Sequence, residues 1–313
     1  MTDGSATRGV LVTGGTGFIG GHVVRALRAR HVDVWVWSRR VAKARAQLDR
    51  DIRVVGALAE IPGEARIDAI VNLAGAPVIG PPWTRARRQL LIDSRVQTTQ
   101  AVLEWCATRA VRPAVLVTAS AIGFYGGFAG PAGDAWLDEA SPPQEVFQSQ
   151  LCREREAAAN AADALGIRVV NLRIGLVLGT DGGIFSRLAL AARLGGAAVI
   201  GDGLQWMSWI HIRDMVRIVE FAIEDATLRG AVNAVAPAPV RQLYFQRALA
   251  CALDRPRWLR IPAGVLRLGL GEMAELLVCG QRVMPRRLQL LGFSFSYATF
   301  ERALADLVKP GRS

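Results

Sequence analysis

An apolar run near the start of the chain stops at a cluster of glycines. Residues 10–13 are mainly β-branched, and apolar positions then recur with helical spacing over residues 18–27. This order predicts a strand, a tight turn and a helix. The turn carries the pattern G-x-x-G-x-x-G, with its three glycines at Gly14, Gly17 and Gly20.

The glycine turn predicts a site for the diphosphate of a dinucleotide. Early glycines allow positive φ and let backbone N–H groups approach an anion, and the last one lets the helix lie close to the strand. A turn with no ligand is the alternative, and the position between a strand and a helix disfavours it. The expected contact residues are Gly14, Gly17, Phe18, Ile19 and Gly20.

Short apolar runs alternate with helical spacing through the first half of the chain. Further strands are expected at 32–37, 52–55, 69–75, 115–118 and 167–173, the third of these closing in a small-residue turn, and further helices at 90–105 and 148–165. Strands that alternate with helices are typical of βαβ units. They predict an α/β protein with a mostly parallel sheet.

A glycine-rich stretch at 175–183 predicts the passage to a second, smaller lobe. Helices are expected at 184–194 and 214–223, a strand at 231–235, and a helical, arginine-rich region beyond Pro237 with breaks at Pro256, Pro262 and Pro285. The predicted division gives residues 1–178 to a nucleotide-binding domain, to which 211–236 returns. The smaller lobe is then formed by 179–210 and 237–313.

Three predicted loops follow strands of the parallel sheet, at 14–20, 72–75 and 120–126. Carboxyl ends of parallel strands share one edge, and ligands bind beyond it. The second loop is mostly small, so its backbone can approach the adenosine and ribose of a cofactor. We therefore expect cofactor contacts from Leu73, Ala74 and Gly75, and from Ser120 at the start of the third loop.

The second predicted strand ends in Ser38, Arg39 and Arg40, with no Asp or Glu at that end. In dinucleotide sites a carboxylate there binds the ribose 2′-OH of NAD, whereas an arginine accommodates the 2′-phosphate of NADP. A serine hydroxyl and a forked guanidinium both bond phosphate oxygens. The pattern favours NADP over NAD, the alternative being that these arginines only solvate the strand end.

The net charge of +11 is carried almost entirely by arginine, since Lys43 and Lys309 are the only lysines. The arginines are spread along the chain without interleaved aromatic residues, so we expect a surface that attracts phosphorylated small molecules and no nucleic-acid partner. The most apolar late stretch, 261–278, contains three charged residues, so no membrane span is expected. The sequence carries no signal for an oligomeric state.

The cysteines are scattered and show no C-x-x-C spacing, and the first eight residues are polar. Both features predict a cytoplasmic protein with reduced thiols and no signal peptide. The three histidines have no metal-ligand spacing with Cys or carboxylates, so no metal is expected.

Motifs over nearly the whole chain carry a family resemblance. They lie at 13–20, 72–75, 120–126, 172–175, 205–211, 271–274, 281–285 and 292–295. With them the chain resembles the extended and atypical short-chain dehydrogenase/reductase superfamily, and more narrowly its nucleoside-diphosphate-sugar-epimerase-like proteins. The resemblance implies a Rossmann-like, doubly wound parallel sheet with a smaller C-terminal substrate lobe. It also implies NADP(H), and it brings no established substrate.

The resemblance also implies a Tyr-x-x-x-Lys pair that this chain lacks. In the superfamily tyrosine is the general acid/base, lysine lowers its pKa and holds the nicotinamide ribose, and a serine orients the substrate. No tyrosine here has a lysine four residues later. Aligned by Glu156, the tyrosine position falls on Gln148 and the lysine position on Cys152.

Three residues are candidates for the missing chemistry. Ser120 matches the serine of the family, although a small residue could simply fit the turn there. Tyr125 is the phenol closest to Ser120 in sequence and could donate a proton, or pack under the nicotinamide or the loop. His211, in an aromatic stretch, could be a general acid or could bond a backbone carbonyl. Cys152 as a nucleophile is disfavoured because no base partner is identifiable.

Two hypotheses of function follow. The first is an epimerase-like oxidoreductase that transfers hydride between NADP(H) and a small carbonyl or nucleotide-sugar-like substrate. The second is a non-catalytic NADP(H)-binding redox sensor or regulatory protein. Ser120 and the elaborate C-terminal region favour the first, and the missing Tyr/Lys pair favours the second.

Overall fold

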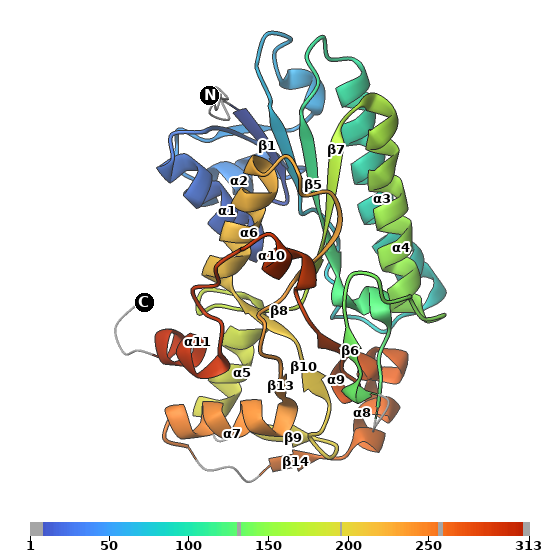
Figure 1. Cartoon of the computed structure of the whole chain (residues 1–313), viewed down its shortest axis with the longest axis vertical. Helices are drawn as coiled ribbons and strands as arrows, with labels where there is room; N and C mark the ends of the chain where they lie inside the picture. The colour runs from blue at the N-terminus through green and yellow to red at the C-terminus, as the bar shows by residue number, and fades with distance from the viewer. Residues whose placement is uncertain (1–8, 130–132, 195, 256–258, 309–313) are drawn as a thin grey trace.

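A computed structural model describes residues 9–129, 133–194, 196–255 and 259–308 (Figure 1), so Pro256 and Lys309 lie outside the described residues. A parallel sheet of seven strands runs through its upper half, in the order β3-β2-β1-β4-β5-β7-β12. The expectation of a doubly wound parallel sheet is confirmed. The strands are β1 (Gly9–Thr13), β2 (Asp33–Trp37), β3 (Arg53–Val55), β4 (Ala69–Asn72), β5 (Val115–Ala121), β7 (Arg168–Ile174) and β12 (Gly230–Ala234).

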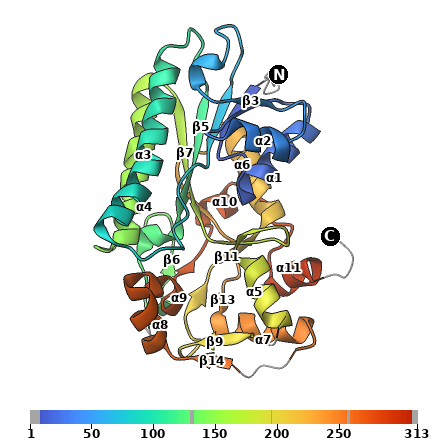
Figure 2. The same cartoon turned by 180° about the vertical axis from the view of Figure 1, so that it is seen from behind.

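Helices cover both faces of the sheet because successive strand residues point to opposite sides. Val10 and Val12 pack on one face with α1 (Phe18–Ala29), α2 (Val41–Gln47) and α6 (Ile212–Glu224). Leu11 packs on the other with α3 (Arg85–Ala107) and the end of α4 (Phe147–Asn160). Figure 2 shows α3 and α4 side by side along that second face. The strands are therefore buried on both sides, as continuous apolar runs require.

A second group of elements lies below the sheet in Figure 1. Its apolar core gathers Trp209, Phe245 and Phe300 between three helices. These are α5 (Gly183–Arg193), α7 (Gln242–Ala252) and α11 (Phe300–Leu307). Short strand pairs accompany them: β8 (Leu176–Leu178) with β11 (Trp209–His211), β9 (Ala198–Ile200) with β14 (Leu259–Ile261), and β10 (Trp206–Met207) with β13 (Val240–Arg241).

The remaining elements join these two groups along one side. A short strand pair, β6 (Trp136–Leu137) with β15 (Arg282–Val283), links the segment before α4 to the C-terminal region. The other elements are α8 (Ala263–Leu270), the 3-10 turn η5 (Gly271–Ala274), α9 (Glu275–Val278) and α10 (Arg286–Leu290). Trp83 and Phe147 pack with Met273 of η5 in a separate apolar cluster.

Four local predictions need correction. The first helix after β4 begins at Arg85, five residues earlier than expected, because the Thr84 side chain accepts from the Arg87 N–H and caps it. The helix predicted at 148–165 ends as α4 at Asn160, and a 3-10 turn, η4 (Ala161–Leu165), completes it. The helix α2 was not predicted. A loop was predicted where β6 lies, and helix was predicted where β13, β14 and β15 lie.

Asp214 fastens the C-terminal segment onto α6. Its carboxylate is fully buried and accepts the backbone N–H groups of Ser296 at 3.0 Å and Tyr297 at 2.8 Å. Arg217, one turn further along α6, donates to the same carboxylate at 2.9 Å. Buried donors without partners are costly, so this carboxylate fixes where the chain passes before α11.

We expect Asp214→Ala to lower the free energy of unfolding by about 2–4 kcal/mol, because two backbone donors and a guanidinium lose their acceptor. Urea denaturation followed by circular dichroism measures the change. Glu224→Ala is the matched control on the same helix, because Glu224 pairs with Arg30 at the surface and such pairs contribute at most about 1 kcal/mol. Equal losses in the two variants would contradict this role of Asp214.

Candidate functional site

Two glycines shape the turn between β1 and α1. Gly14 has a φ of +70°, which side chains rarely adopt. A Cβ on Gly20 would lie 2.1 Å from the carbonyl oxygen of Gly14, so only glycine lets α1 begin this close to the turn. Gly17, the N-cap, brings no side chain, and the first turn of α1 has no acidic residue. The positive end of the helix dipole is therefore open to an anion, which fits a dinucleotide diphosphate.

Buried polar side chains join this turn to the end of β4. Thr13 Oγ1 donates to Asn72 Oδ1 at 2.6 Å and accepts from the Ala74 N–H at 3.1 Å. The Asn72 amide donates in turn to Thr99 Oγ1 of α3 at 2.9 Å. These bonds hold two of the three predicted loops side by side at the carboxyl edge of the sheet.

The glycine-rich segment 179–183 lies against the start of α1. A Cβ on Gly179 would lie 2.6 Å from the ring of Phe18, so this side chain packs directly on the segment. His22 Nε2 lies 2.9 Å from Asp181 Oδ1. These contacts position the segment beside the first turn of α1, next to the open helix end.

Ser38, Arg39 and Arg40 lie between β2 and α2, at the same edge. The Ser38 hydroxyl oxygen accepts from the Arg40 N–H at 3.2 Å. Both arginine side chains are exposed and form no ion pair within the described chain. They keep their full donor capacity for a ligand.

Ser120 belongs to a buried network between β5, α4 and β7. Its hydroxyl donates to Glu156 Oε1 at 2.6 Å. Arg173 donates to both Glu156 oxygens, at 3.0 Å and 2.9 Å. This forked pair holds Glu156 as a carboxylate, which can only accept. The Ser120 hydroxyl therefore donates to Glu156, and toward a ligand its oxygen can act only as a hydrogen-bond acceptor.

Tyr125 is bonded inside the protein, between the turn after β5 and the neighbouring strands. Its hydroxyl is fully buried, donates to Asn233 Oδ1 at 2.7 Å and accepts from Arg173 Nη1 at 3.1 Å. Burial, which disfavours the phenolate, raises the pKa of Tyr125 to about 12. This geometry favours a structural role that ties the turn after β5 to β12.

His211 caps the N-terminus of α6. Its Nδ1 accepts from the Arg213 N–H at 3.2 Å, its ring stacks on Tyr297 at 3.8 Å, and its Nε2 lies 3.5 Å from Asp306. Burial lowers the pKa of His211 to about 4, although Asp306 opposes the shift. The imidazole is neutral at pH 7, and both of its nitrogens face protein groups. This arrangement, too, favours a structural role.

Gln148 and Cys152, at the tyrosine and lysine positions of the resemblance, lie on the buried face of α4. The Gln148 side chain is 8 % exposed, and its amide has no hydrogen bond within the described chain. Cys152 Sγ lies 3.6 Å from the Ala121 carbonyl oxygen, and burial raises the pKa of this thiol to about 11. Neither group is an acid or a base near neutral pH, and Gln148 can donate to a ligand.

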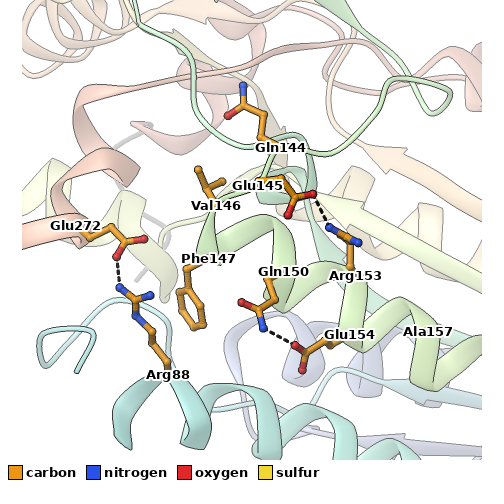
Figure 3. A pocket seen from close by; sticks show the side chains of 10 residues that line it. All are labelled: Arg88, Gln144, Glu145, Val146, Phe147, Gln150, Arg153, Glu154, Ala157 and Glu272. Atoms are coloured by element: carbon orange, nitrogen blue, oxygen red, sulfur yellow. Dashed lines mark hydrogen bonds and ion pairs between the residues drawn. The ribbon is translucent and has the colours of Figure 1, made fainter. Parts of the chain in front are cut away.

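A groove on the far side of α4 is separate from this edge (Figure 3). Four of its five α4 residues, Gln150, Arg153, Glu154 and Ala157, lie on the helix face opposite the buried one, and Phe147 lies at the start of the helix. Its charged groups are already paired, as Arg88 is with Glu272. The helix therefore stands between this groove and Ser120.

No group of three or more His, Cys, Asp or Glu side chains is placed within the described chain to hold a metal ion. None of the helices described is long and apolar enough to span a bilayer.

The sheet, its glycine turn and the adjoining loops define a nucleotide-binding protein of the Rossmann type. The family model described as "NAD dependent epimerase/dehydratase family" matches residues 10–234, and the chain belongs to that family. A second model, a domain of unknown function called DUF1731, matches residues 261–307. The resemblance found in the sequence is confirmed.

Similar proteins match over almost the full chain. The epimerase family protein YfhF of Bacillus subtilis is 33% identical over 96% of this chain and 97% of its own length. The chloroplastic SDR39U1 homolog of Arabidopsis thaliana is 34% identical over 96% of this chain and 86% of its own. The crystal structure of human epimerase family protein SDR39U1 with NADPH has a TM-score of 0.83 and 31% identity, covering 96% and 99% of the two chains.

The sequence missed the hydrogen-bonded core of this edge. Arg173 lies inside an apolar strand, and a charge in such a place requires a buried partner, which could have pointed to Glu156. The contacts of Thr13, Asn72 and Thr99 gave no such signal, because their side chains meet only in the folded sheet.

The neutral state of His211 predicts a pH-dependent stability. Unfolded histidine has a pKa near 6.5, so the unfolded state binds a proton that the folded state refuses. The contribution is complete above about pH 6.5 and is lost as the pH falls toward 4. Between about pH 7.5 and pH 5, the wild type should lose about 2 kcal/mol of unfolding free energy relative to His211→Asn. Urea denaturation at both pH values measures this difference, and a pH-independent difference would contradict a neutral His211.

Proposed function

We propose that this protein is an NADP(H)-binding, epimerase-like oxidoreductase that transfers hydride to or from a small carbonyl or nucleotide-sugar-like compound. The observation that carries the proposal is the glycine turn, open at the start of α1 and tied by Thr13 to the loop after β4. A nicotinamide cofactor supplies or accepts the hydride when it is bound. The four free cysteines fit the cytoplasmic location that we propose with it.

In this proposal three groups of residues at the edge bind different parts of the cofactor. Backbone N–H groups of Phe18 and Ile19, at the start of α1, are placed to bind the diphosphate. The loop of Leu73, Ala74 and Gly75 lies beside them for the adenosine and its ribose. The exposed cations of Arg39 and Arg40, together with Ser38, suit a 2′-phosphate, and NADPH in the human relative supports this choice.

We expect wild-type protein to bind NADPH at least about tenfold more tightly than NADH. Arg39→Asp should weaken NADPH binding by about tenfold or more and NADH binding by less than about threefold, because only NADPH brings the 2′-phosphate to that side chain. Fluorescence titration of both nucleotides measures the four affinities.

Arg50→Asp is the matched control, since Arg50 is exposed and carries the same change of charge away from the end of β2. Equal affinity for the two nucleotides, tighter binding of NADH, or no loss in Arg39→Asp would sink the preference for NADP.

At the substrate end, Ser120 and Gln148 complement each other. The Ser120 hydroxyl donates its hydrogen bond to Glu156, so its oxygen can accept a hydrogen bond from a substrate hydroxyl. The unbonded Gln148 amide can donate to a substrate oxygen that is becoming, or ceasing to be, a carbonyl. Neither residue titrates near pH 7 by its chemistry, so the proton that balances hydride transfer is exchanged with water.

Ser120→Ala should lower kcat by about tenfold to a hundredfold while the affinity for NADPH changes by less than about twofold. The reason is that the hydroxyl contacts the reacting oxygen and not the cofactor phosphates. The measurement is NADPH oxidation across a panel of carbonyl compounds and nucleotide sugars. Ser186→Ala, on α5, is the control. Unchanged turnover in Ser120→Ala would remove Ser120 from the reaction.

The second candidate is a non-catalytic NADP(H)-binding redox sensor or regulatory protein. The commitment of the Ser120 proton to Glu156 and the inward hydroxyl of Tyr125 favour it, because no proton donor then faces the edge. Tight NADPH binding combined with no oxidation of NADPH across the whole panel would support this second candidate over the first.

A further inference from the structure

Two arginines between α3 and α4 carry charges that no carboxylate of the described chain neutralises. Arg155 is 5% exposed, and Arg95 is half-buried. Neither forms an ion pair within the described residues, whereas the neighbouring Arg173 is fully paired with Glu156. A buried charge is strongly disfavoured unless an opposite charge or strong hydrogen bonds compensate it.

Arg155 reaches from α4 to the carboxyl end of β4 and to the middle of its neighbour β5. Its Nη2 donates to the Asn72 carbonyl oxygen at 2.8 Å, and its Nε lies 3.4 Å from Thr118 Oγ1. No hydrogen bond within the described chain uses Nη1. The guanidinium therefore lies where β4 ends, beside the middle of β5, and its Nη1 keeps its donor capacity.

Arg95 approaches the same loop from α3. Its Nη2 donates to the Ala76 carbonyl oxygen at 2.9 Å, and its guanidinium carbon would lie 3.0 Å from a Cβ on Gly75. The two guanidinium groups thus hold both ends of the loop 72–76. Burial, and after it the charge of Arg95, lowers the pKa of Arg155 to about 9, so Arg155 is still a cation at pH 7. Burial also lowers the pKa of Arg95.

The charged neighbours on α4 do not supply the missing anion. Glu156 is bound by Arg173 and Ser120. Cys152, one helical turn before Arg155, has its pKa raised to about 11 by burial and is a neutral thiol at pH 7. Within the described residues, no carboxylate pairs with either of these two arginines.

We propose that Arg155, supported by Arg95, binds an anionic group of a ligand, a phosphate or a carboxylate, where β4 ends. The inference rests on the proposed function only for the presence of a ligand at this edge. The anion belongs either to the dinucleotide or to an acidic substrate, and the experiment separates the two sources.

The test compares wild type, Arg155→Met, Arg155→Lys and the control Arg153→Met. Arg153 lies on the same helix, is exposed and pairs with Glu145 at the surface. Titration calorimetry measures the affinity for NADPH. Thermal unfolding with and without inorganic phosphate or malonate, each added to NADPH-saturated protein, measures binding of a second anion.

If the dinucleotide provides the anion, Arg155→Met weakens NADPH binding by about tenfold or more, Arg155→Lys weakens it less, and Arg153→Met stays within about twofold. If a substrate provides it, NADPH affinity is unchanged in Arg155→Met. The rise in Tm that phosphate or malonate gives to wild type then disappears in that variant.

Two results would overturn the inference. One is an Arg155→Met protein that loses Tm without ligand yet binds NADPH, phosphate and malonate as wild type does, which would make Arg155 a structural cation. The other is wild type whose Tm none of the three anions raises. If wild type binds NADPH and Arg155→Met changes neither NADPH affinity nor the Tm rise with phosphate or malonate, the proposed function stands without the inference. If only phosphate or malonate binds, and needs Arg155, the inference stands and the proposed cofactor fails.

Discussion

The buried ion pair of Glu156 and Arg173 is the interaction on which the carboxyl edge of this sheet depends. It joins α4 to β7 across the interior, and its desolvated charges are tolerated because each is bonded from several directions. Through it the hydroxyl of Ser120 is fixed toward α4. Arg173 also bonds Tyr125 and stacks on the ring of Phe124, 3.3 Å from its centroid. This ion pair therefore orients the Ser120 hydroxyl and contacts both aromatic side chains of the turn after β5.

The glycine turn can keep its shape while the polar side chains of α4 differ from those of the superfamily. The cradle is made by backbone, through Gly14 and Gly20 and the start of α1, and does not depend on the side chains of α4. The groups that would handle protons do lie on α4. Replacing them with Gln148 and Cys152 changes the reactivity of the site without disturbing the helix, because both still pack against the turn after β5.

The architecture was predictable from the sequence because its signals are local. Apolar β-branched runs stop at glycines, and the helices between them have a clear apolar face, so the alternation specifies a parallel sheet. What the sequence could not give was the pairing of side chains from distant elements. Ser120 was found as a site residue, but its bond to Glu156 joins residues 36 apart. Tyr125 and His211 have the right chemistry for catalysis, and only the fold reveals that their polar atoms face protein groups.

Short elements were missed for a related reason. The strands β13, β14 and β15 have two or three residues each, which is too few for an alternating pattern to be recognised in the sequence. They form because each pairs with a strand from a distant part of the chain. The arginines follow the same logic in electrostatic terms. In sequence Arg155 and Arg173 are alike, one charge among many. In the fold Arg173 pairs with a carboxylate, whereas Arg155 contacts only a carbonyl and a hydroxyl oxygen. A buried cation without a carboxylate partner still attracts an anion strongly. For this reason our proposed anion site is at Arg155 and not at Arg173.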